Sequence, residues 1–453
     1  MSDPARDPTS FAARLSRGRP SPARVAFQDE RAFGPRLRLR RWGLGNGLTV
    51  WTLPDGAAPV VSYQTWFGVG AKHDPPRRSG LAHFFEHLMF LGTERYPAGA
   101  LDEAFEAVGA DNNAMTGCDT TAYVTSLPRS ALPLAIDVEA DRLAGLLLDV
   151  AEVEREREVV LSERRDAVED DVAGRASELL WRTAFRRHPY GRPILGWSRD
   201  VRRIGIEDLH AFYAARYAPA NATLVVAGDF DEEALLRRVQ EAYGALAPGE
   251  SRPAEPAPEP GQRRERRVDL PWPTDAAKLQ IGWRTPGVAH PDHVALSLFV
   301  FLLFGGRSAR ARQRLMRDQE LATEIAGFLS PFRGEGLYEL WLGLREGVAP
   351  EDALAALDAL VEEALGAPFA QDEIEKARRR LRLSLFTSLE TAEGRAERAG
   401  SDALVLGDPA AAWRFEAALR GVDDATLRAA AARVFRPSRR SVVTVRPARR
   451  EAS

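Results

Sequence analysis

Residues 80–93 read Gly80-Leu-Ala-His-Phe-Phe-Glu-His-Leu-Met-Phe-Leu-Gly-Thr93. Between the two glycines the stretch has no Pro or Gly, and leucine and phenylalanine side chains coat it, which predicts a buried helix. His83 and His87 stand at positions i and i+4, so a turn of about 3.6 residues places both imidazoles on one face. Glu86 lies at the neighbouring edge of that face. Two imidazoles with a carboxylate beside them are typical of a zinc site whose general base activates water.

A second interpretation of the histidine pair has to be weighed. Two histidines at helical spacing arise by chance in many chains, and a buried histidine is usually a hydrogen-bonded core residue. A catalytic zinc site needs a third protein ligand. The search for that ligand elsewhere in the chain therefore decides between the two interpretations.

The candidate for the third ligand lies in a run of helix-forming residues at 152–166, which is rich in glutamate. Most of these charges are expected to form a solvated face. Glu156 and Glu163 are seven apart (163 − 156 = 7), about two turns, so they share one face of the helix. One of the two could complete the histidine pair, and the other could support the site from outside. The composition does not distinguish them.

The bulk composition is that of an ordinary soluble globular protein. Its 453 residues predict more than one domain, and 45% of them are apolar and 28% charged. A net charge of −3 gives no electrostatic case for a nucleic-acid or membrane-surface partner. The single cysteine, Cys118, excludes an intrachain disulfide. No apolar run approaches the length of about 18 residues that predicts a membrane span, and without a recognisable signal we expect a cytoplasmic protein.

The chain is predicted to fall into four regions. Residues 1–35 are rich in Arg, Ser, Ala and Pro, and we expect a loose N-terminal arm, because their acidic residues argue against an organelle transit peptide. Residues 36–247 are expected to form a first domain. Residues 248–267 (PGESRPAEPAPEPGQRRERR) bury almost nothing and predict a semi-rigid, Pro-rich linker. Residues 268–453 are expected to form a second domain.

The first domain is expected to mix strands and helices. Residues 37–53 predict a hairpin, since alternating Leu and Arg lead into a Gly-Asn-Gly turn and an apolar strand returns. The remaining elements are predicted from β-branched runs and helical periodicity. They are extended segments at 60–68, 110–127 and 222–227 and helices at 101–108, 132–148 and 206–217.

Asn113 and Ala114 lie within the extended segments at 110–127. One interpretation makes them ordinary residues of a sheet edge. The other has this edge hold an extended peptide, which would join the sheet as an additional strand. The sequence alone leaves the two interpretations open.

The second half repeats the first. Both halves read helix, aromatic residue, any residue, Pro and then an apolar strand, at an offset of 218 residues (427 − 209 = 218). The strand expected at 278–283 and the helix expected at 294–303 correspond to the first strand and to the histidine helix of the first half. By this alignment Leu296, Phe299 and Val300 occupy the places of His83, Glu86 and His87, in that order, so the second copy has the fold without the chemistry. The residues matched at the offset are Leu209, Tyr217, Pro219 and Val225 with Leu427, Phe435, Pro437 and Val443.

The motif HFFEH, followed 76 positions later (163 − 87 = 76) by the last Glu of EREVVLSE, resembles the pitrilysin, or insulinase, family of zinc peptidases. Its inverted H-x-x-E-H signature is that of the inverzincins. The likeness runs over about residues 36–445, nearly the whole chain. Further matching stretches are GLA before His83, FLGT after it, NAMT from Asn113, HPYGRP from His188, and YAPAN followed by LVVAGD from Tyr217.

The resemblance implies a fold, a metal and a set of roles. The fold it implies is α+β: two tandem homologous domains, each an antiparallel sheet flanked by helices, joined by the Pro-rich linker and facing across a cleft. The implied cofactor is one zinc ion per chain. The implied site residues are His83, His87 and Glu163 as zinc ligands, Glu86 as catalytic base, Glu156 as a supporting glutamate outside the ligand set, and Asn113 and Ala114 on the strand that holds substrate.

One departure from the family pattern bears on partners. Members that act alone carry an Arg and a Tyr, seven apart, in the second half, and the resemblance assigns them to substrate contact. Here Met316 and Thr323 stand in those places, and neither supplies the lost charge or phenol. We therefore expect a heterodimer with a homologous subunit that carries the Arg/Tyr pair. The alternative is that Arg312, Arg314 or another group substitutes, which would leave a self-sufficient enzyme or a homodimer.

Taken together, the motifs predict a zinc-dependent endopeptidase that hydrolyses short or unfolded peptides with a glutamate as general base. A scaffold or binding subunit of a heteromeric peptidase-like complex, inactive or weakly active by itself, is the alternative. Relatives of that kind usually lose zinc ligands, whereas this chain keeps the full set that the resemblance implies.

Overall fold

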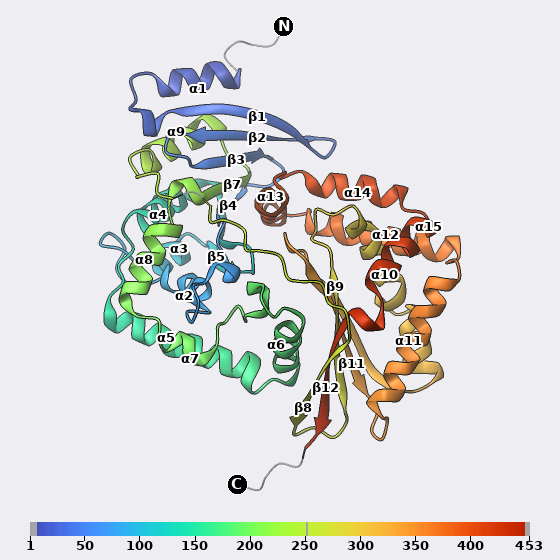
Figure 1. Ribbon diagram of the computed structural model, residues 1–453. Coiled ribbons are helices and arrows are strands. Elements are labelled where there is room, and N and C mark those ends of the chain that lie inside the picture. Colours follow the sequence, from blue (N-terminus) through green and yellow to red (C-terminus); the bar gives the residue numbers. More distant parts are fainter. Residues whose placement is uncertain (1–6, 251, 449–453) are drawn as a thin grey trace. The chain divides into compact units, whose positions relative to one another are not determined.

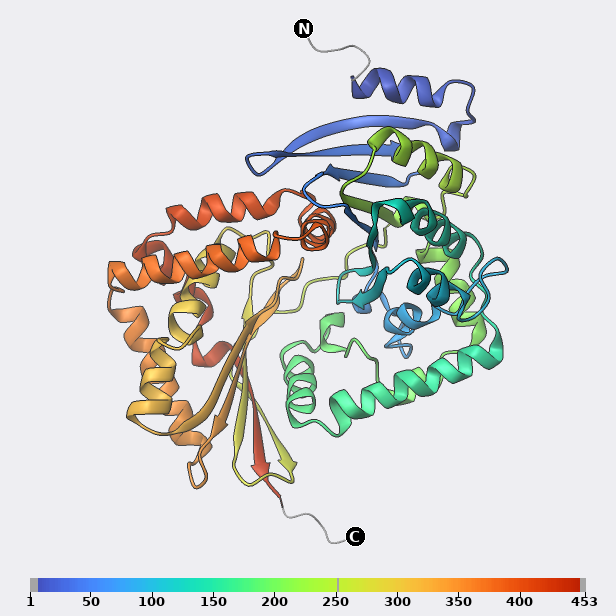
Figure 2. The same ribbon diagram turned by 180° about the vertical axis from the view of Figure 1, so that it is seen from behind.

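The computed structural model describes residues 7–250 and 252–448 (Figures 1 and 2). The chain folds into two compact units, and each is built from segments that are not contiguous in sequence. The first unit comprises Met1–Leu161, Ile194–Glu255 and Phe386–Trp413, and the second comprises Ser162–Pro193, Pro256–Leu385 and Arg414–Ser453.

The first unit is organised around a seven-stranded sheet with the order β1-β2-β3-β7-β4-β6-β5. All neighbouring strands are antiparallel except β3 and β7, which run parallel. The strand β5 lies at one edge. The strands are β1 (Val25–Phe33), β2 (Leu37–Leu44), β3 (Thr49–Pro54), β4 (Val60–Phe67), β5 (Asp111–Thr116), β6 (Thr121–Pro128) and β7 (Ala222–Gly228).

Helices cover this sheet and bury its apolar face. The predicted hairpin forms as β2 and β3, where Gly47 takes the left-handed conformation that the turn needs (φ +93°). The core draws on the sheet and on the helices α2, α4, α5, α8 and α9. The helices of this unit are α1 (Pro8–Ser16), α2 (Leu81–Leu88), α3 (Ala100–Ala107), α4 (Leu132–Gly145), α5 (Val150–Arg164), α7 (Ser198–Val201), α8 (Ile206–Arg216), α9 (Glu232–Tyr243) and α13 (Ala392–Leu406).

The second unit has a five-stranded sheet with the order β10-β11-β9-β12-β8. Figures 1 and 2 show α10 (Asp292–Phe304), α11 (Pro350–Gly366) and α15 (Asp424–Val434) on one face of this sheet and α6 (Val172–Ala184) on the other. Its strands are β8 (Arg266–Trp272), β9 (Lys278–Thr285), β10 (Ala322–Leu329), β11 (Gly336–Leu344) and β12 (Arg440–Pro447). Its helices are α6 (Val172–Ala184), α10 (Asp292–Phe304), α11 (Pro350–Gly366), α12 (Gln371–Ser388), α14 (Ala411–Gly421) and α15 (Asp424–Val434).

The two sheets repeat one another, as the sequence predicted. Five strands of the first sheet, β3-β7-β4-β6-β5, have the same order as β8-β12-β9-β11-β10 in the second. In each, the first two strands of that series are parallel and the rest antiparallel, so the sheets are mixed rather than purely antiparallel. The strands β4 and β9 begin at Val60 and Lys278, at the same offset of 218 (278 − 60 = 218) as the matched residues. The predicted α+β duplication is therefore confirmed, while a cleft between the two units stays a prediction.

The division into units differs from the predicted domains 36–247 and 268–453. The helix α6 comes from the first half of the sequence but packs on β8, β9 and β12 of the second sheet. The helix α13 comes from the second half but packs on β4 and β7 of the first sheet. Each half therefore supplies one covering helix to the other half's sheet, an exchange that the linear order of motifs does not reveal.

The prediction of a loose arm over residues 1–35 is wrong for the described part, residues 7–35. Asp7 caps the helix α1 by accepting a hydrogen bond from the Ser10 N–H (2.9 Å), and Phe11 and Leu15 are buried in the first core. The Phe11 ring meets Trp42 edge-on, with ring centroids 6.1 Å apart. The strand β1 then pairs with β2 along its whole length. The prediction was based on the Arg-rich composition of the segment, which does not show that a few apolar side chains, such as Phe11 and Leu15, attach it to the core.

The predicted linker, residues 248–267, has no helix or strand among its described residues until β8 begins at Arg266. Its first part is held within the first unit, where Glu255 accepts from the buried Lys72 ammonium (2.5 Å). Arg252 donates to the Leu404 carbonyl (3.0 Å) in the same unit. Among the described helices, none is long and apolar enough to cross a membrane.

Candidate metal centre

The histidine helix α2 is capped from a distance. The residue at its N-cap position, Gly80, has a left-handed backbone (φ +90°), and a Cβ there would lie 2.8 Å from the Leu195 carbonyl oxygen and from Gly196 Cα. A glycine offers no side-chain cap. Asp74, six residues earlier and buried, takes that role: its carboxylate accepts from the N–H groups of Gly80 (2.7 Å) and Ala82 (2.9 Å).

Removing this cap is expected to destabilise the first unit. Asp74→Ala leaves two buried helix N–H groups without their charged acceptor, and we expect a loss of about 3 kcal/mol in the free energy of unfolding. The matched control is Asp149→Ala, because exposed Asp149 accepts from the N–H groups of Ala151 (2.9 Å) and Glu152 (3.1 Å) at the start of α5. Water can replace that exposed acceptor, so the control should cost about 1 kcal/mol. Urea unfolding measures both, and equal losses would contradict the assigned cap.

The helix α2 brings the two histidines together. The ring centroids of His83 and His87 are 5.0 Å apart, at an interplanar angle of 67°. The His83 side chain is buried, and this burial, with His87 beside it, lowers the pKa of His83 to about 3. The imidazole is therefore neutral at ordinary pH, which is the form that binds a metal ion.

The helix α5 is fixed against α2 by packing rather than by its many charges. Val153, Val160 and Leu161 are buried in the same core as α2. The guanidinium of Arg157 lies over the Phe84 ring of α2 (5.3 Å to the centroid) and donates to the Val201 carbonyl. The face that carries Glu156 and Glu163 is thereby turned toward the histidines.

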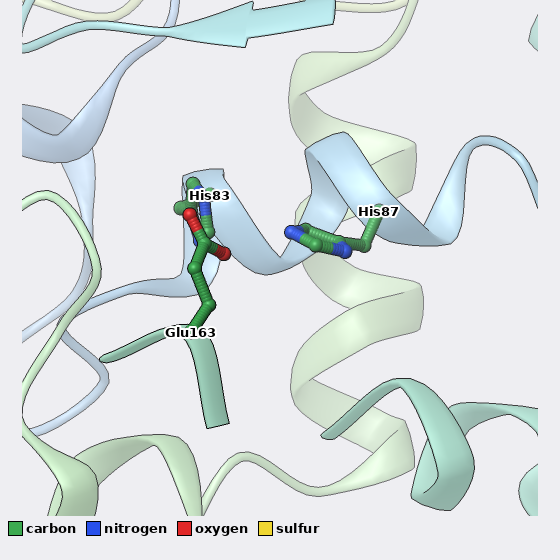
Figure 3. Close-up of side chains that lie close together, drawn as sticks. All are labelled: His83, His87 and Glu163. Carbon is green, nitrogen blue, oxygen red and sulfur yellow. The ribbon is translucent and has the colours of Figure 1, made fainter. Parts of the chain in front are cut away.

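The two glutamates on that face have different neighbours. Glu156 Oε2 lies 3.4 Å from His87 Nδ1. Glu163, at the end of α5, joins both histidines: one potential ligand atom from each of His83, His87 and Glu163 lies within 4.8 Å of the others (Figure 3). The boundary between the compact units falls after Leu161, but α5 is continuous to Arg164, so its packed first part positions Glu163.

The donor set of His83, His87 and Glu163 fits a zinc ion. Two imidazole nitrogens and one carboxylate oxygen are a common ligand set of catalytic zinc sites, in which the fourth position remains open. Zinc–ligand bonds of about 2.0–2.2 Å place tetrahedral ligand atoms about 3.4 Å apart. The observed separations of up to 4.8 Å are close enough for small side-chain rotations to meet that spacing.

Glu86 lies beside a pair of buried tyrosines. The Tyr123 hydroxyl donates to the carbonyl of Phe85 (3.2 Å) and lies 3.3 Å from the Tyr217 hydroxyl. Burial raises the pKa of both phenols, and the Glu86 charge adds to that rise in smaller measure. Both tyrosines therefore stay neutral, and they support the backbone of α2 next to Glu86.

Asn113 and Ala114 lie on β5, the edge strand beside α2. Both pair with β6 on the inner side of the strand, Asn113 with Val124 and Ala114 with Tyr123. The Asn113 side-chain oxygen accepts from the Ala114 N–H (2.8 Å). The position is that of a sheet edge, which is compatible with both interpretations of these two residues.

The second copy carries no metal ligands at the corresponding place. Leu296 and Phe299 on α10 are fully buried, and Val300 is partly buried among apolar side chains. Thr323 stands where the family pattern has a tyrosine, and its hydroxyl donates to the Gly343 carbonyl (3.3 Å). Met316 stands where the pattern has an arginine, and its Sδ atom lies 3.6 Å from Arg312 Nη1.

Sequence reasoning missed the contribution of Asp74. This residue lies in a polar loop that carries no recognisable motif, and it precedes α2 by too many residues to be read as an ordinary helix cap. The available signal was a glycine at the N-cap position, because a helix with such a cap needs an acceptor from elsewhere for its first N–H groups.

Comparison with known proteins establishes the family. Residues 50–197 match the family described as Insulinase (Peptidase family M16), and residues 203–381 match the domain described as Peptidase M16 inactive domain. The chain belongs to peptidase family M16, the insulinase family. The resemblance read from the motifs is thus confirmed.

Individual relatives point in the same direction. The chain is 31% identical over 383 residues to an "Uncharacterized zinc protease" of Streptomyces coelicolor, covering 82% of this chain and 81% of the relative. It is 29% identical to a "Probable mitochondrial-processing peptidase subunit beta" of Schizosaccharomyces pombe, covering 80% and 81%. The crystal structure of a protease from Helicobacter pylori has the same fold, with a TM-score of 0.86, 23% identity and coverage of 90% and 99%.

Proposed function

We propose that this chain is a zinc-dependent endopeptidase of short or unfolded peptides. His83, His87 and Glu163 would hold one zinc ion, and Glu86 would be the general base. The observation that carries this proposal is the meeting of a carboxylate from α5 with two imidazoles from α2. A zinc ion bound there would supply Lewis acidity, which lowers the pKa of water and polarises a carbonyl group.

The residues of the chain have distinct tasks in this proposal. Glu86 takes a proton from the attacking water and returns it to the leaving amine. Glu156, at 3.4 Å from His87 Nδ1, holds that ring so that its other nitrogen faces the metal position. The β5 edge at Asn113 and Ala114 aligns an extended peptide beside α2.

The test of the proposal combines metal analysis with peptide turnover. We expect about one zinc ion per purified chain and cleavage of an unstructured fluorogenic peptide, both abolished by a chelator and restored by zinc. A chain that binds no zinc, or that hydrolyses the peptide equally after complete metal removal, would refute the proposal. The cytoplasmic location expected from the sequence stays a prediction.

A scaffold or binding subunit remains the second candidate, and the second copy is the observation that favours it. That copy has apolar residues in place of ligands, and Met316 and Thr323 in place of the Arg/Tyr pair. A chain that retains zinc but turns over no peptide, even with a partner, would fit the scaffold and not the enzyme.

We also propose that full activity needs a homologous subunit with the missing Arg and Tyr. The two nearby arginines that could substitute are already engaged: Arg312 donates to the Ile325 carbonyl (2.6 Å), and Arg314 pairs with Glu363. A self-sufficient enzyme in which another group substitutes, or a homodimer, is the remaining alternative. The relative from Schizosaccharomyces pombe is named as one subunit of a peptidase, which is consistent with a divided enzyme.

The partner prediction has a direct measurement. Loss of donors aimed at the transition state typically lowers kcat about 10²–10³-fold, so we expect the isolated chain to be about 100-fold less active than the chain purified with its native partner. Co-purification from the native source, followed by peptide assays at equal chain concentration, measures the ratio. An isolated chain as active as the co-purified material would rule out the partner.

A further inference from the structure

A second cavity in this protein is lined by arginines rather than by metal ligands. It has a volume of about 560 Å³, lies wholly within the second unit and is formed where the end of α6 meets the start of β8. Only Leu179 and Val268 contribute large apolar side chains. The charged lining residues are Arg182, Arg186, Arg264, Arg266, Arg267 and a single acid, Glu265.

The acid in this cavity pairs with only one of the arginines that line it, Arg267. Both carboxylate oxygens of Glu265 are taken, one by Arg267 and the other by Arg440. Arg182, Arg186 and Arg264 form no ion pair with any residue that the structure describes. Glu265 therefore leaves most of the positive charge in the cavity uncompensated.

Backbone carbonyl groups hold the Arg266 side chain among the other arginines of the cavity. Its guanidinium donates to the carbonyls of Thr183 (2.7 Å) and Ala184 (2.9 Å) at the end of α6, where the helix presents unsatisfied acceptors. Burial lowers the pKa of Arg266, and the neighbouring charge of Arg186 is the next cause. Like charges that are held together in this way favour a bound anion.

A carboxylate outside the lining, that of Glu259, also acts on Arg266. Glu259 is buried and accepts hydrogen bonds from the backbone N–H groups of Arg186 (3.0 Å), Arg187 (2.7 Å) and His188 (2.8 Å). It fixes the turn that carries Arg186, but it does not line the cavity. Its charge offsets part of the repulsion that Arg186, Arg284 and Arg264 exert on Arg266, and the remaining positive charge is left for a ligand or for solvent ions.

We propose that the arginine cavity binds a compact multivalent oxyanion of the phosphate class. Guanidinium groups bind phosphate oxygens through paired, directional hydrogen bonds. The clustered arginines of the lining favour an oligophosphate, whose charges lie on directly bonded phosphate groups, over a peptide, whose carboxylates stand on flexible side chains spaced along a backbone. The site is independent of the zinc chemistry, because its lining includes neither the histidines nor Glu163.

Titration calorimetry of the full chain with sodium tripolyphosphate tests the proposal. We expect saturable binding with one site per chain, weakened at higher salt. Arg182→Ala/Arg186→Ala, two exposed positions, should weaken binding tenfold or more, since each lost charge-assisted hydrogen bond corresponds to about a tenfold change. An unchanged melting temperature without ligand would show that the double variant is folded.

The chain offers a matched control with the same loss of charge. Arg17 and Arg19 are exposed and belong to the first unit, so Arg17→Ala/Arg19→Ala leaves the lining of the arginine cavity intact and should change tripolyphosphate affinity by less than about twofold. Equal weakening in both double variants would overturn the assignment, and so would the absence of saturable binding. Binding of hexaglutamate as tight as that of tripolyphosphate would overturn the choice of a phosphate over an acidic peptide.

Discussion

Glu86→Gln is expected to lower peptide hydrolysis by about 10³-fold or more while leaving the bound metal in place. The amide has nearly the shape of the carboxylate but cannot accept a proton, and a positioned general base typically contributes about 10²–10⁴-fold. Glu86 is not one of the three residues whose potential ligand atoms lie together. The variant therefore leaves the donor atoms of His83, His87 and Glu163 in place. Activity should fall through kcat rather than through peptide affinity.

The measurement pairs metal content with kcat and KM on one fluorogenic peptide. Glu94→Gln is the matched control, because this glutamate lies close in sequence to His87 but is exposed to solvent. The control should keep both zinc and activity. A Glu86→Gln protein with near-normal kcat would remove Glu86 from the chemistry, whereas loss of zinc in that variant would make it a metal ligand instead.

The histidine pair was predictable because its geometry is local. Residues at i and i+4 share a face in any α-helix, so the spacing alone brought His83 and His87 together. The same argument could not choose between Glu156 and Glu163, since both lie on one face of α5. The choice depends on how α5 crosses α2, which Arg157, Phe84 and the buried valines determine. Tertiary packing of this kind leaves no short-range signal in a sequence.

The duplicated fold was also predictable, but its division into units was not. The offset of 218 residues is visible in the starts of the strands β4 and β9 and in the Pro two positions after each matched aromatic residue. Each of these features belongs to a single element, so it can be recognised in the sequence. The exchange of α6 and α13 between the halves involves amphipathic helices whose apolar stripes would suit either sheet. Trp181 on α6 illustrates the point: its indole N–H donates to Glu339 of β11 (2.9 Å), a partner 158 positions away.

Glu163→Ala is the second variant for which we expect a very large effect: loss of stoichiometric zinc and, with it, of nearly all peptide hydrolysis. Removing one of the three proposed ligands leaves the two imidazoles of α2, which are too few for a stable catalytic site. Glu156→Ala removes only the carboxylate beside His87 Nδ1, and outer contacts of this kind typically cost about 10–100-fold in metal affinity or activity.

The comparison of these two variants tests the assignment more sharply than either alone. Competition with a fluorescent chelator measures zinc affinity, and the expected order is wild type, then Glu156→Ala, then Glu163→Ala. Both residues lie on one face of the same helix, so a general loss of helix stability would affect the two variants alike. The reverse order would make Glu156 the ligand and would contradict the convergence of His83, His87 and Glu163 on which the proposed chemistry depends.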